Sequence, residues 1–333
     1  MPINKGIILA QARNLYYNPG MCADVSSFSS HFLRAVGQPL QAGLPLARHS
    51  SFQIGGPADY FFEARKTEEL VRALALARRE GVPYHVIGGG TNLLFDDRGF
   101  RGLIIKNGIK EIRLCEDDVL AVQSGSTLKE FLQFCVEKKR QGLEFLAGIP
   151  GTVGGAVYGN AGAFGQCIGS FLFDVRLLSL SGRTLTRPAE EMEFSYRDSL
   201  LKRSGDILLE ARFRLKEGDP EVMRRTMSEH IAGREKKHPP YTVASAGSYF
   251  KNPFPPRKQA AAAVLLEKAG AKELKHGGAS VSPIHANFIV NTGHATAADV
   301  RALAEELKER VRKRFGVELE EEVIYLPADS SGP

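Results

Sequence analysis

The chain has 333 residues and a net charge of +6, and its length favours two or three domains because single hydrophobic cores stop growing near about 250 residues. Ordinary hydrophobic (43%) and charged (25%) fractions exclude a disordered chain, and the 34 glycines follow no collagen-like period. The positive charges are spread along the chain, which favours a solvated basic surface over a nucleic-acid partner.

The first elements alternate strands with helices. Residues 1 to about 45 mix Ser, Gly and Pro with little periodicity, so we expect a loosely attached N-terminal extension. Order is predicted to begin at Ser50. We then expect strands at 58–65, 84–87, 103–106 and 119–123, and helices from a cap at Thr67 to Glu80 and from Ser126 to about Lys139.

The second half continues this α+β pattern. We expect strands at 172–180, 207–215, 288–291 and 317–325, and helices at 220–237 and 259–269. The prolines after His238 end the first of these helices. A long helix begins at Thr296, where Asp299 completes a capping box. The whole pattern predicts an α+β protein in about three compact parts.

An uncharged run at 145–173 imitates a membrane helix, because Gly151, Gly155 and Gly159 repeat at the spacing of helix-pairing motifs. Pro150 and further glycines would make it a poor helix, so we interpret it as a buried glycine-rich loop system. The N-terminal apolar run is too short for a secretory signal. We therefore expect a cytoplasmic protein without membrane insertion.

The four cysteines and the histidines show no spacing typical of metal ligands. No metal site is predicted, and the scattered cysteines fit a reducing compartment.

Two glycine loops are the candidate ligand site. The first, at 88–94, directly follows a predicted strand, and glycine exposes backbone N–H groups that can surround a phosphate. It has neither the Lys-Ser/Thr ending of a P-loop nor the pattern of a Rossmann turn. The second, at 148–163, could hold the other end of an extended dinucleotide. The alternative is a closely packed loop that binds no ligand.

Motifs along the chain resemble a known family. They lie at residues 54–58, 88–94, 148–162, 195–199, 246–253, 285–291 and 319–323. They occur in the order seen in the UDP-N-acetylenolpyruvoylglucosamine reductases, the MurB family. The resemblance covers about residues 46 to 326, which is nearly all of the predicted ordered chain.

The resemblance implies an α+β fold in which two subdomains bind FAD, as in the PCMH or vanillyl-alcohol-oxidase type, and a C-terminal α+β domain binds substrate. The implied boundaries are 1–45 for the extension, 46–108 and 109–217 for the FAD-binding subdomains, 218–326 for the substrate domain and 327–333 for a tail. Little room separates Arg197 from the strand at Ile207. The chain therefore resembles the shorter, type II form, which lacks a tyrosine-bearing substrate loop.

The implied activity belongs to peptidoglycan precursor synthesis. NADPH reduces non-covalently bound FAD and leaves, and UDP-GlcNAc-enolpyruvate is then reduced to UDP-N-acetylmuramate. Flavin N5 supplies the hydride, Ser248 matches the family's proton donor, and Arg197 with Glu322 matches the pair that stabilises the enolate. Both ligands are anionic, which suits the positive net charge. We expect a monomer that neither binds nucleic acid nor inserts into a membrane.

Further positions follow from the same resemblance. Tyr196, Lys237 and Asn252 match substrate-contacting residues. The positions matched to FAD binding are Gly88, Gly89, Gly90, Thr91, Asn92, Leu93, Gly148, Ile149, Pro150, Gly151, Gly155 and Val157.

The residue types suit this chemistry. A guanidinium such as Arg197 meets a carboxylate through a planar pair of donors, and the contact strengthens as negative charge grows. A serine hydroxyl protonates a carbon only when neighbouring donors assist it. Glu322 must be protonated, or share a proton with a water, to help rather than repel the enolate, and its apolar neighbours Val323 and Ile324 favour a raised pKa.

Two other hypotheses stay open on the residues alone. One is a flavin-dependent sugar or alcohol oxidase that uses oxygen, in which the Ser248 and Glu322 motifs would have no role. The other is a non-enzymatic nucleotide-binding or nucleic-acid-binding protein, supported only by the glycine loops and the basic pI of about 9.1.

Overall fold

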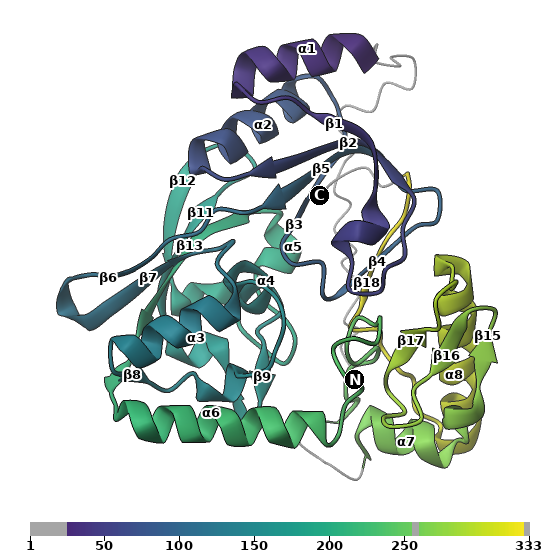
Figure 1. The fold of residues 1–333 in the computed structure, drawn as a ribbon. Coiled ribbons are helices and arrows are strands. Elements are labelled where there is room, and N and C mark those ends of the chain that lie inside the picture. Colours follow the sequence, from purple (N-terminus) through teal and green to yellow (C-terminus); the bar gives the residue numbers. More distant parts are fainter. Residues whose placement is uncertain (1–24, 255–259, 330–333) are drawn as a thin grey trace, which may run out of the picture.

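The computed structural model describes residues 25–254 and 260–329. These residues form three parts, each built on its own sheet (Figure 1). In this view the first part lies at the top, the second at the lower left and the third at the lower right, and the long helix α6 (Pro220–Glu235) runs along the bottom. The α+β class expected from the sequence is confirmed.

The first part is a four-stranded sheet in the order β1-β2-β5-β3, in which β1 is antiparallel to β2 and the other neighbours are parallel. Its elements are β1 (Gln41–Pro45), β2 (Pro57–Ala64), α2 (Thr67–Arg79), β3 (Tyr84–Ile87) and β5 (Phe100–Asn107). The carboxylate of Glu69 accepts from the backbone N–H of Lys66, which is the N-cap of α2. The cap expected at Thr67 is therefore one residue too late.

Helix α1 (Val25–Val36) corrects the prediction of a loose extension. Phe28 and Phe32 are fully buried, and their rings lie 4.9 Å from Tyr60 and 5.1 Å from Phe62 of β2. Together with β1, this helix makes residues 25–45 part of the first core, whereas residues 1–24 lie outside the described chain. Phe28 and Phe32 lie four residues apart and so share one face of the helix, but the residues between them are polar, and the strand that this face covers is distant in sequence.

The second part is a five-stranded antiparallel sheet in the order β12-β11-β13-β7-β6. Its strands are β6 (Ile112–Leu114), β7 (Val119–Gln123), β11 (Leu172–Leu178), β12 (Thr184–Pro188) and β13 (Ile207–Arg214). Helix α3 (Leu128–Glu137) packs on it through Phe131, whose ring lies 4.9 Å from that of Phe213. The strands β8 (Arg140–Gln141) and β14 (Lys216–Glu217) pair beside α3.

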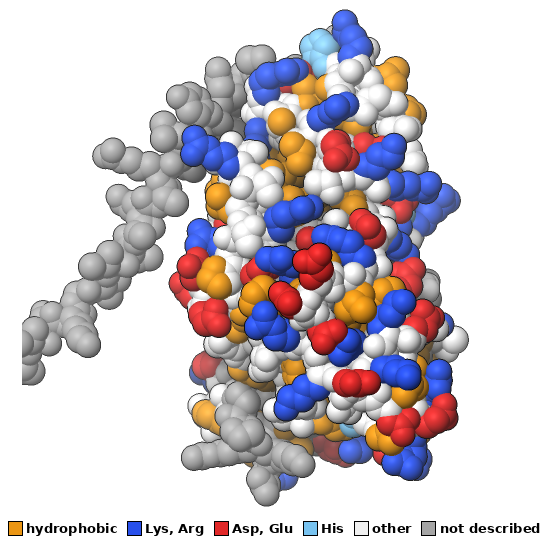
Figure 2. All heavy atoms as spheres, turned by 90° about the vertical axis from the view of Figure 1, so that its left-hand side faces the viewer, with side chains coloured by type: hydrophobic (Ala, Val, Ile, Leu, Met, Phe, Trp, Pro, Cys, Tyr) orange, Lys and Arg blue, Asp and Glu red, His pale blue; other side chains and the backbone are white. Residues whose placement is uncertain are grey.

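The left-hand side of the molecule carries basic and acidic side chains interspersed with one another (Figure 2). Within the second sheet, Arg113 pairs with the buried Glu210 at 2.8 Å, and Arg212 pairs with the buried Asp174. A mixed charge pattern of this kind is typical of a solvated surface.

The uncharged run at 145–173 is only partly the loop system expected. It contains helix α4 (Val153–Tyr158), whose N-cap Thr152 accepts from the N–H of Gly155, and the hairpin β9 (Gly162–Ala163) and β10 (Gln166–Cys167). A Cβ at Gly154 would lie 2.9 Å from the carbonyl oxygen of Ser124, so glycine allows α4 to approach the sheet closely. None of the helices in the described residues is long and apolar enough to cross a membrane.

The third part combines helices with a three-stranded antiparallel sheet, β15-β16-β17. Its elements are α7 (Ala262–Lys268), β15 (Lys275–His276), β16 (Ala279–Val281), β17 (Ile289–Asn291) and α8 (Ala297–Phe315). The capping box predicted for α8 is confirmed, because Thr296 and Asp299 each accept the other's backbone N–H.

The predicted last strand at 317–325 is wrong over most of its length. Only β18 (Ile324–Leu326) forms, and it pairs in parallel with β4 (Leu93–Phe95) of the first part. The strand is short because its partner β4 has only three residues, and a strand extends only as far as it finds a partner. This pairing joins the third part to the first.

Replacing Phe28 with Ala should lower the free energy of unfolding by about 3–5 kcal/mol, because it empties a fully buried ring site. Urea unfolding followed by circular dichroism measures the change. Leu33 lies on the same helix but is 50% exposed, so Leu33→Ala should cost about 0.5 kcal/mol or less. Equal, small effects of both variants would contradict the assignment of α1 to the core.

Candidate active site

A cavity of about 1160 Å³ lies between the three parts. It is larger than the roughly 300–1,000 Å³ of most small-molecule sites, so it can hold a large ligand and a second molecule beside it. Its lining comes from segments that are far apart in sequence: residues 84–93, 148–162, 201–208, 238–248 and 322–327.

The two glycine loops contact one another at this cavity. A Cβ on Gly89 would lie 3.3 Å from the Cα of Gly151, and the hydroxyl of Thr91 donates to the carbonyl of Pro150 at 3.4 Å. The loops predicted to hold two ends of one ligand are therefore adjacent.

The first glycine loop has uncommitted backbone donors. Within the described residues, the N–H groups of Gly89, Gly90 and Thr91 donate to no other protein group. Gly90 has φ +66°, and a Cβ there would lie 1.9 Å from the carbonyl oxygen of His49, so only glycine fits. Its own carbonyl accepts from the N–H of Ser51 at 3.0 Å. The contact from Ser51 thus fixes the loop through a carbonyl group, while its consecutive N–H groups stay available for an anion.

Arg197 and Glu322 meet at the cavity. The Nε atom of Arg197 lies 2.6 Å from Oε1 of Glu322, and the terminal guanidinium nitrogens donate to the carbonyl of Gly162 at 3.3 Å. Both side chains are largely buried, at 24% and 21% exposure. Burial raises the pKa of Glu322 above its ordinary value although the Arg197 charge opposes the shift. The pair is thus a strong electrostatic contact with a carboxyl group that retains its proton more readily than usual.

Ser248 is held close to Glu322 by the backbone of its neighbour Tyr249. The N–H of Glu322 donates to the carbonyl of Tyr249 at 2.8 Å, and the N–H of Tyr249 donates to the carbonyl of Asn287 at 2.7 Å. The buried amide of Asn287 also bonds both the N–H and the carbonyl of Phe250. The 285–291 motif therefore acts through Asn287, which fixes the serine segment.

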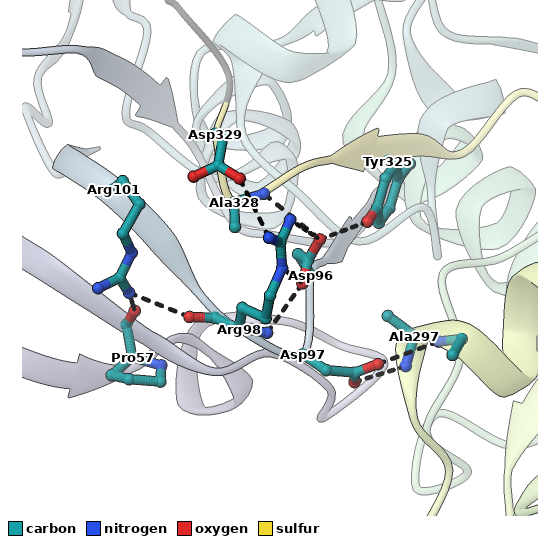
Figure 3. A network of polar contacts seen from close by, with 10 residues as sticks. Pro57, Asp96, Asp97, Arg98, Arg101, Ala297, Tyr325, Ala328 and Asp329 are labelled. Carbon is teal, nitrogen blue, oxygen red and sulfur yellow. Dashed lines mark hydrogen bonds and ion pairs between the residues drawn. The ribbon is translucent and has the colours of Figure 1, made fainter. Parts of the chain in front are cut away.

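A polar network holds the strand that follows Glu322 (Figure 3). Asp96, just after β4, accepts from the hydroxyl of Tyr325 at 2.6 Å and from the N–H groups of Arg98 and Ala328 at 2.8 and 3.4 Å. Burial alone would raise the pKa of Asp96, but the hydrogen bonds from Tyr325 and Arg98 outweigh it and lower the pKa. Asp96 is therefore ionised in the folded protein at neutral pH.

Two further contacts connect the same strands. The side chain of Asp97 accepts from the first N–H groups of α8, at Ala297 and Ala298 (Figure 3). At the opposite end of β4, the amide of Asn92 donates to the carbonyl of Glu322 at 3.0 Å. The first glycine loop and Glu322 therefore lie side by side, just before the parallel strands β4 and β18 begin.

Most of the predicted site residues line this one cavity. They are the catalytic candidates Arg197, Ser248 and Glu322 and the cofactor candidates Gly88, Gly89, Gly90, Thr91, Asn92, Leu93, Gly148, Ile149, Pro150, Gly151 and Gly155. Val157 lies elsewhere, because the geometry of α4 turns its side chain fully into the second core.

The three substrate candidates do not line the cavity. The hydroxyl of Tyr196 accepts from the N–H of Asn252 at 3.1 Å, so these two lie together beside Arg197. Lys237 is exposed beyond the end of α6. Arg234, one turn earlier, lines the cavity instead and donates to the carbonyls of Ala147 and Phe145 at 3.0 and 3.2 Å.

Sequence reasoning missed several cavity residues, including Lys202, Arg234, His238 and Tyr241. The first lies on the short helix α5 (Leu201–Ser204), five residues after Arg197, and only that turn brings the two together. Burial lowers the pKa of Arg234. Among the described residues, no group of three or more His, Cys, Asp or Glu side chains is arranged to hold a metal ion.

Comparisons with known proteins agree with one another. Residues 58–186 match the profile of an FAD binding domain, and residues 239–326 match the C-terminal domain of UDP-N-acetylenolpyruvoylglucosamine reductase. The reductase of that name from Solibacter usitatus is 39% identical, over 88% of this chain and 100% of that protein. The one from Heliobacterium modesticaldum is 41% identical, over 86% and 90%. The crystal structure of MurB from Thermus caldophilus has a TM-score of 0.72 and 33% identity, covering 86% of this chain and 99% of that one.

Replacing Tyr325 with Phe should lower the free energy of unfolding by about 1.5–3 kcal/mol at pH 7, because it removes a donor to a buried carboxylate. The pKa of Asp96 is lowered in the folded state, so this stabilisation is fully present above its ordinary pKa of about 3.9 and is lost as the pH falls from there through the folded-state pKa. Urea unfolding at pH 7 and at successively lower pH, down to about pH 2, follows the cost of the substitution.

Tyr84→Phe provides the control. The hydroxyl of Tyr84 contacts Arg78 at 2.8 Å and no carboxylate, so its cost should stay constant over that pH range. A cost for Tyr325→Phe that is equally constant would contradict the role given to the Asp96 carboxylate.

Proposed function

Because the chain belongs to the UDP-N-acetylenolpyruvoylglucosamine reductase family, we propose that it reduces UDP-GlcNAc-enolpyruvate to UDP-N-acetylmuramate with electrons from NADPH. The chain is an FAD-dependent oxidoreductase of peptidoglycan precursor synthesis, built from an FAD-binding domain and a MurB C-terminal domain. The observation that carries the proposal is the convergence of Arg197, Ser248 and Glu322 with both glycine loops on one cavity.

The residues at the cavity fit FAD. The unpaired amides of Gly89, Gly90 and Thr91 would hold its pyrophosphate, and the adjoining loop at 148–151 would pack against the rest of the molecule. FAD bound there would, after reduction by NADPH, supply a hydride to the substrate. The first loop contains no histidine to which the flavin could be linked, so the FAD would be bound non-covalently.

Arg197 would bind the enolpyruvyl carboxylate. The cavity keeps its guanidinium largely out of water, so its attraction for a growing negative charge is strong. The contact with Glu322 holds the guanidinium in place before substrate arrives. Arg197 then stabilises the enolate more strongly than the ground state, which is the requirement for catalysis.

Glu322 would act in its protonated form. A carboxylate beside the enolate would repel it, whereas a carboxylic acid donates a hydrogen bond to it. Burial favours the protonated form by raising the pKa of Glu322. When the substrate carboxylate pairs with the Arg197 guanidinium, the positive charge lowers the pKa of Glu322 less than before, and the protonated form is favoured further.

Ser248 would deliver the proton to carbon. It lines the same cavity as Glu322, and the backbone bonds of Tyr249 keep the two segments side by side. Gly247, at φ +79°, makes the turn that presents the serine. Proton delivery from this side leaves Arg197 free to hold the carboxylate.

The domain assignment follows as part of this proposal. The FAD-binding subdomains comprise residues 25–108 and 109–217, and the substrate domain comprises 218–326. Only the short helix α5 separates the Arg197 turn from β13, which supports the type II form without a long substrate loop. That the enzyme is a cytoplasmic monomer stays a prediction.

The test is an anaerobic reoxidation experiment. The purified protein should be yellow, and acid should release the colour as FAD. After reduction by NADPH, addition of UDP-GlcNAc-enolpyruvate should reoxidise the flavin far faster than buffer does. Reoxidation only by oxygen would favour a sugar or alcohol oxidase and would overturn the proposal.

Ser248→Ala should slow reoxidation by UDP-GlcNAc-enolpyruvate by about 10³-fold, the usual contribution of a proton donor. Reduction of the flavin by NADPH should be nearly unchanged, because that half-reaction needs no proton from serine. Stopped-flow absorbance at the flavin band measures both rates. Ser280→Ala, on β16, removes a hydroxyl that contacts only a neighbouring carbonyl and should leave both rates unaltered. Equal losses in both half-reactions would mean that Ser248 only supports the fold.

The reoxidation rate should fall as the pH rises through the raised pKa of Glu322, because the acid is protonated only below it. Glu322→Gln should be slower than wild type and lack this decline. Glu321→Gln is the matched control, since Glu321 adjoins Glu322 but pairs with Lys308 at 2.6 Å. If Glu321→Gln instead abolished the decline of the rate with pH, the pH dependence would belong to Glu321, and its assignment to Glu322 would be wrong.

A further inference from the structure

We propose that Lys202 is a positioning residue that holds the Arg197 turn in its active conformation and places a second positive charge beside the Arg197–Glu322 pair. The inference rests on the proposed function, because it concerns binding of the substrate carboxylate.

Arg197 lies in a strained turn. Ser195 and Asp198 exchange two backbone hydrogen bonds of 3.2 Å, and between them Arg197 has φ +56°, a left-handed conformation that costs a non-glycine residue free energy. Such a conformation persists only where the surroundings hold it. Glycine would relieve the strain but would remove the guanidinium.

Lys202 supplies a restraint at the strained residue itself. Its ammonium group donates to the carbonyl oxygen of Arg197 at 2.6 Å, a charge-assisted bond of the strong kind. Two other contacts act at the ends of the turn: the amide of Asn160 donates to the carbonyl of Ser195 at 2.8 Å, and Arg203 pairs with Asp198. Of these three contacts, only the one from Lys202 is made to the backbone of Arg197 itself.

The position of Lys202 also makes its charge matter. Its side chain lines the cavity, and the ammonium lies 5.6 Å from the centre of the Tyr158 ring, a cation–π contact that favours charge out of water. Burial, followed by the charge of Lys251, lowers the pKa of Lys202. Groups perturbed in this way concentrate at functional sites. A desolvated ammonium here adds to the attraction of Arg197 for an anionic ligand.

A purely structural role would have a different signature. If Lys202 only completed the packing of α5, its loss would weaken FAD binding and both half-reactions together. If Lys202 positions Arg197, its loss weakens the step in which the substrate carboxylate meets the guanidinium. Flavin reduction would then proceed at the normal rate.

The experiment compares Lys202→Met, Lys202→Arg and Lys202→Ala in the FAD-loaded full chain. Lys202→Met should slow reoxidation by UDP-GlcNAc-enolpyruvate about 10²-fold, with a higher substrate concentration at half-maximal rate, because the guanidinium that meets the substrate carboxylate is then misplaced. Lys202→Arg should recover most of this loss. Ethylamine should accelerate Lys202→Ala and not wild type, because the cavity gives a small amine access to the empty ammonium position.

Lys110→Met is the matched control. The ammonium of Lys110 is half exposed, pairs with Glu130 at 2.8 Å and is not among the residues that line the cavity. This variant should stay within about threefold of wild type, which is the range of ordinary surface charge effects. FAD affinity, followed by flavin fluorescence, and the rate of flavin reduction should be unchanged in every Lys202 variant.

The outcomes separate the two proposals. Lys202→Met with wild-type reoxidation, or with equal loss of FAD binding and both half-reactions, overturns the positioning role alone. Failure of amine to rescue Lys202→Ala, together with no recovery in Lys202→Arg, also overturns it. A wild-type enzyme that UDP-GlcNAc-enolpyruvate does not reoxidise overturns the proposed function, and the role of Lys202 with it.

Discussion

The parallel pairing of β4 with β18 is the contact on which the active site depends. β4 continues directly from the first glycine loop, and β18 begins two residues after Glu322, so the pairing places both segments at the same end. Asn92 bridges them, and Asp96 holds the other end through Tyr325 and Ala328. A slip of one residue would turn Glu322 to the opposite face. The cofactor loop and the candidate acid are thus positioned by one short ladder.

Buried charge sets the second constraint. Arg197 and Glu322 are both largely removed from water, and such a pair repays its desolvation only where further contacts satisfy its groups. Here the guanidinium also donates to the Gly162 carbonyl, and Lys202 bonds the Arg197 backbone. Strain at Arg197 and a raised pKa at Glu322 are two expressions of this arrangement.

Much of the fold could be predicted, because strong local patterns coincide with tertiary structure. β3 and β7 have the expected bounds, and the α8 capping box depends only on residues three apart. Helix α1 was missed because its apolar stripe consists of few residues among serines, and the sheet it covers is not visible in sequence. The last strand was predicted too long because only the three-residue partner β4 limits it.

For the site, the sequence by itself determined which residue types meet: glycines that expose backbone amides, a guanidinium, a hydroxyl and a carboxyl group in recognisable motifs. The family could be inferred from motif order alone. Only the tertiary structure decided that Val157 lies in the core, that Arg234 and not Lys237 lines the cavity, and that Lys202 bonds the Arg197 carbonyl. These outcomes depend on helix phase and on contacts between distant segments. Local sequence carries no information on either until the three parts pack together.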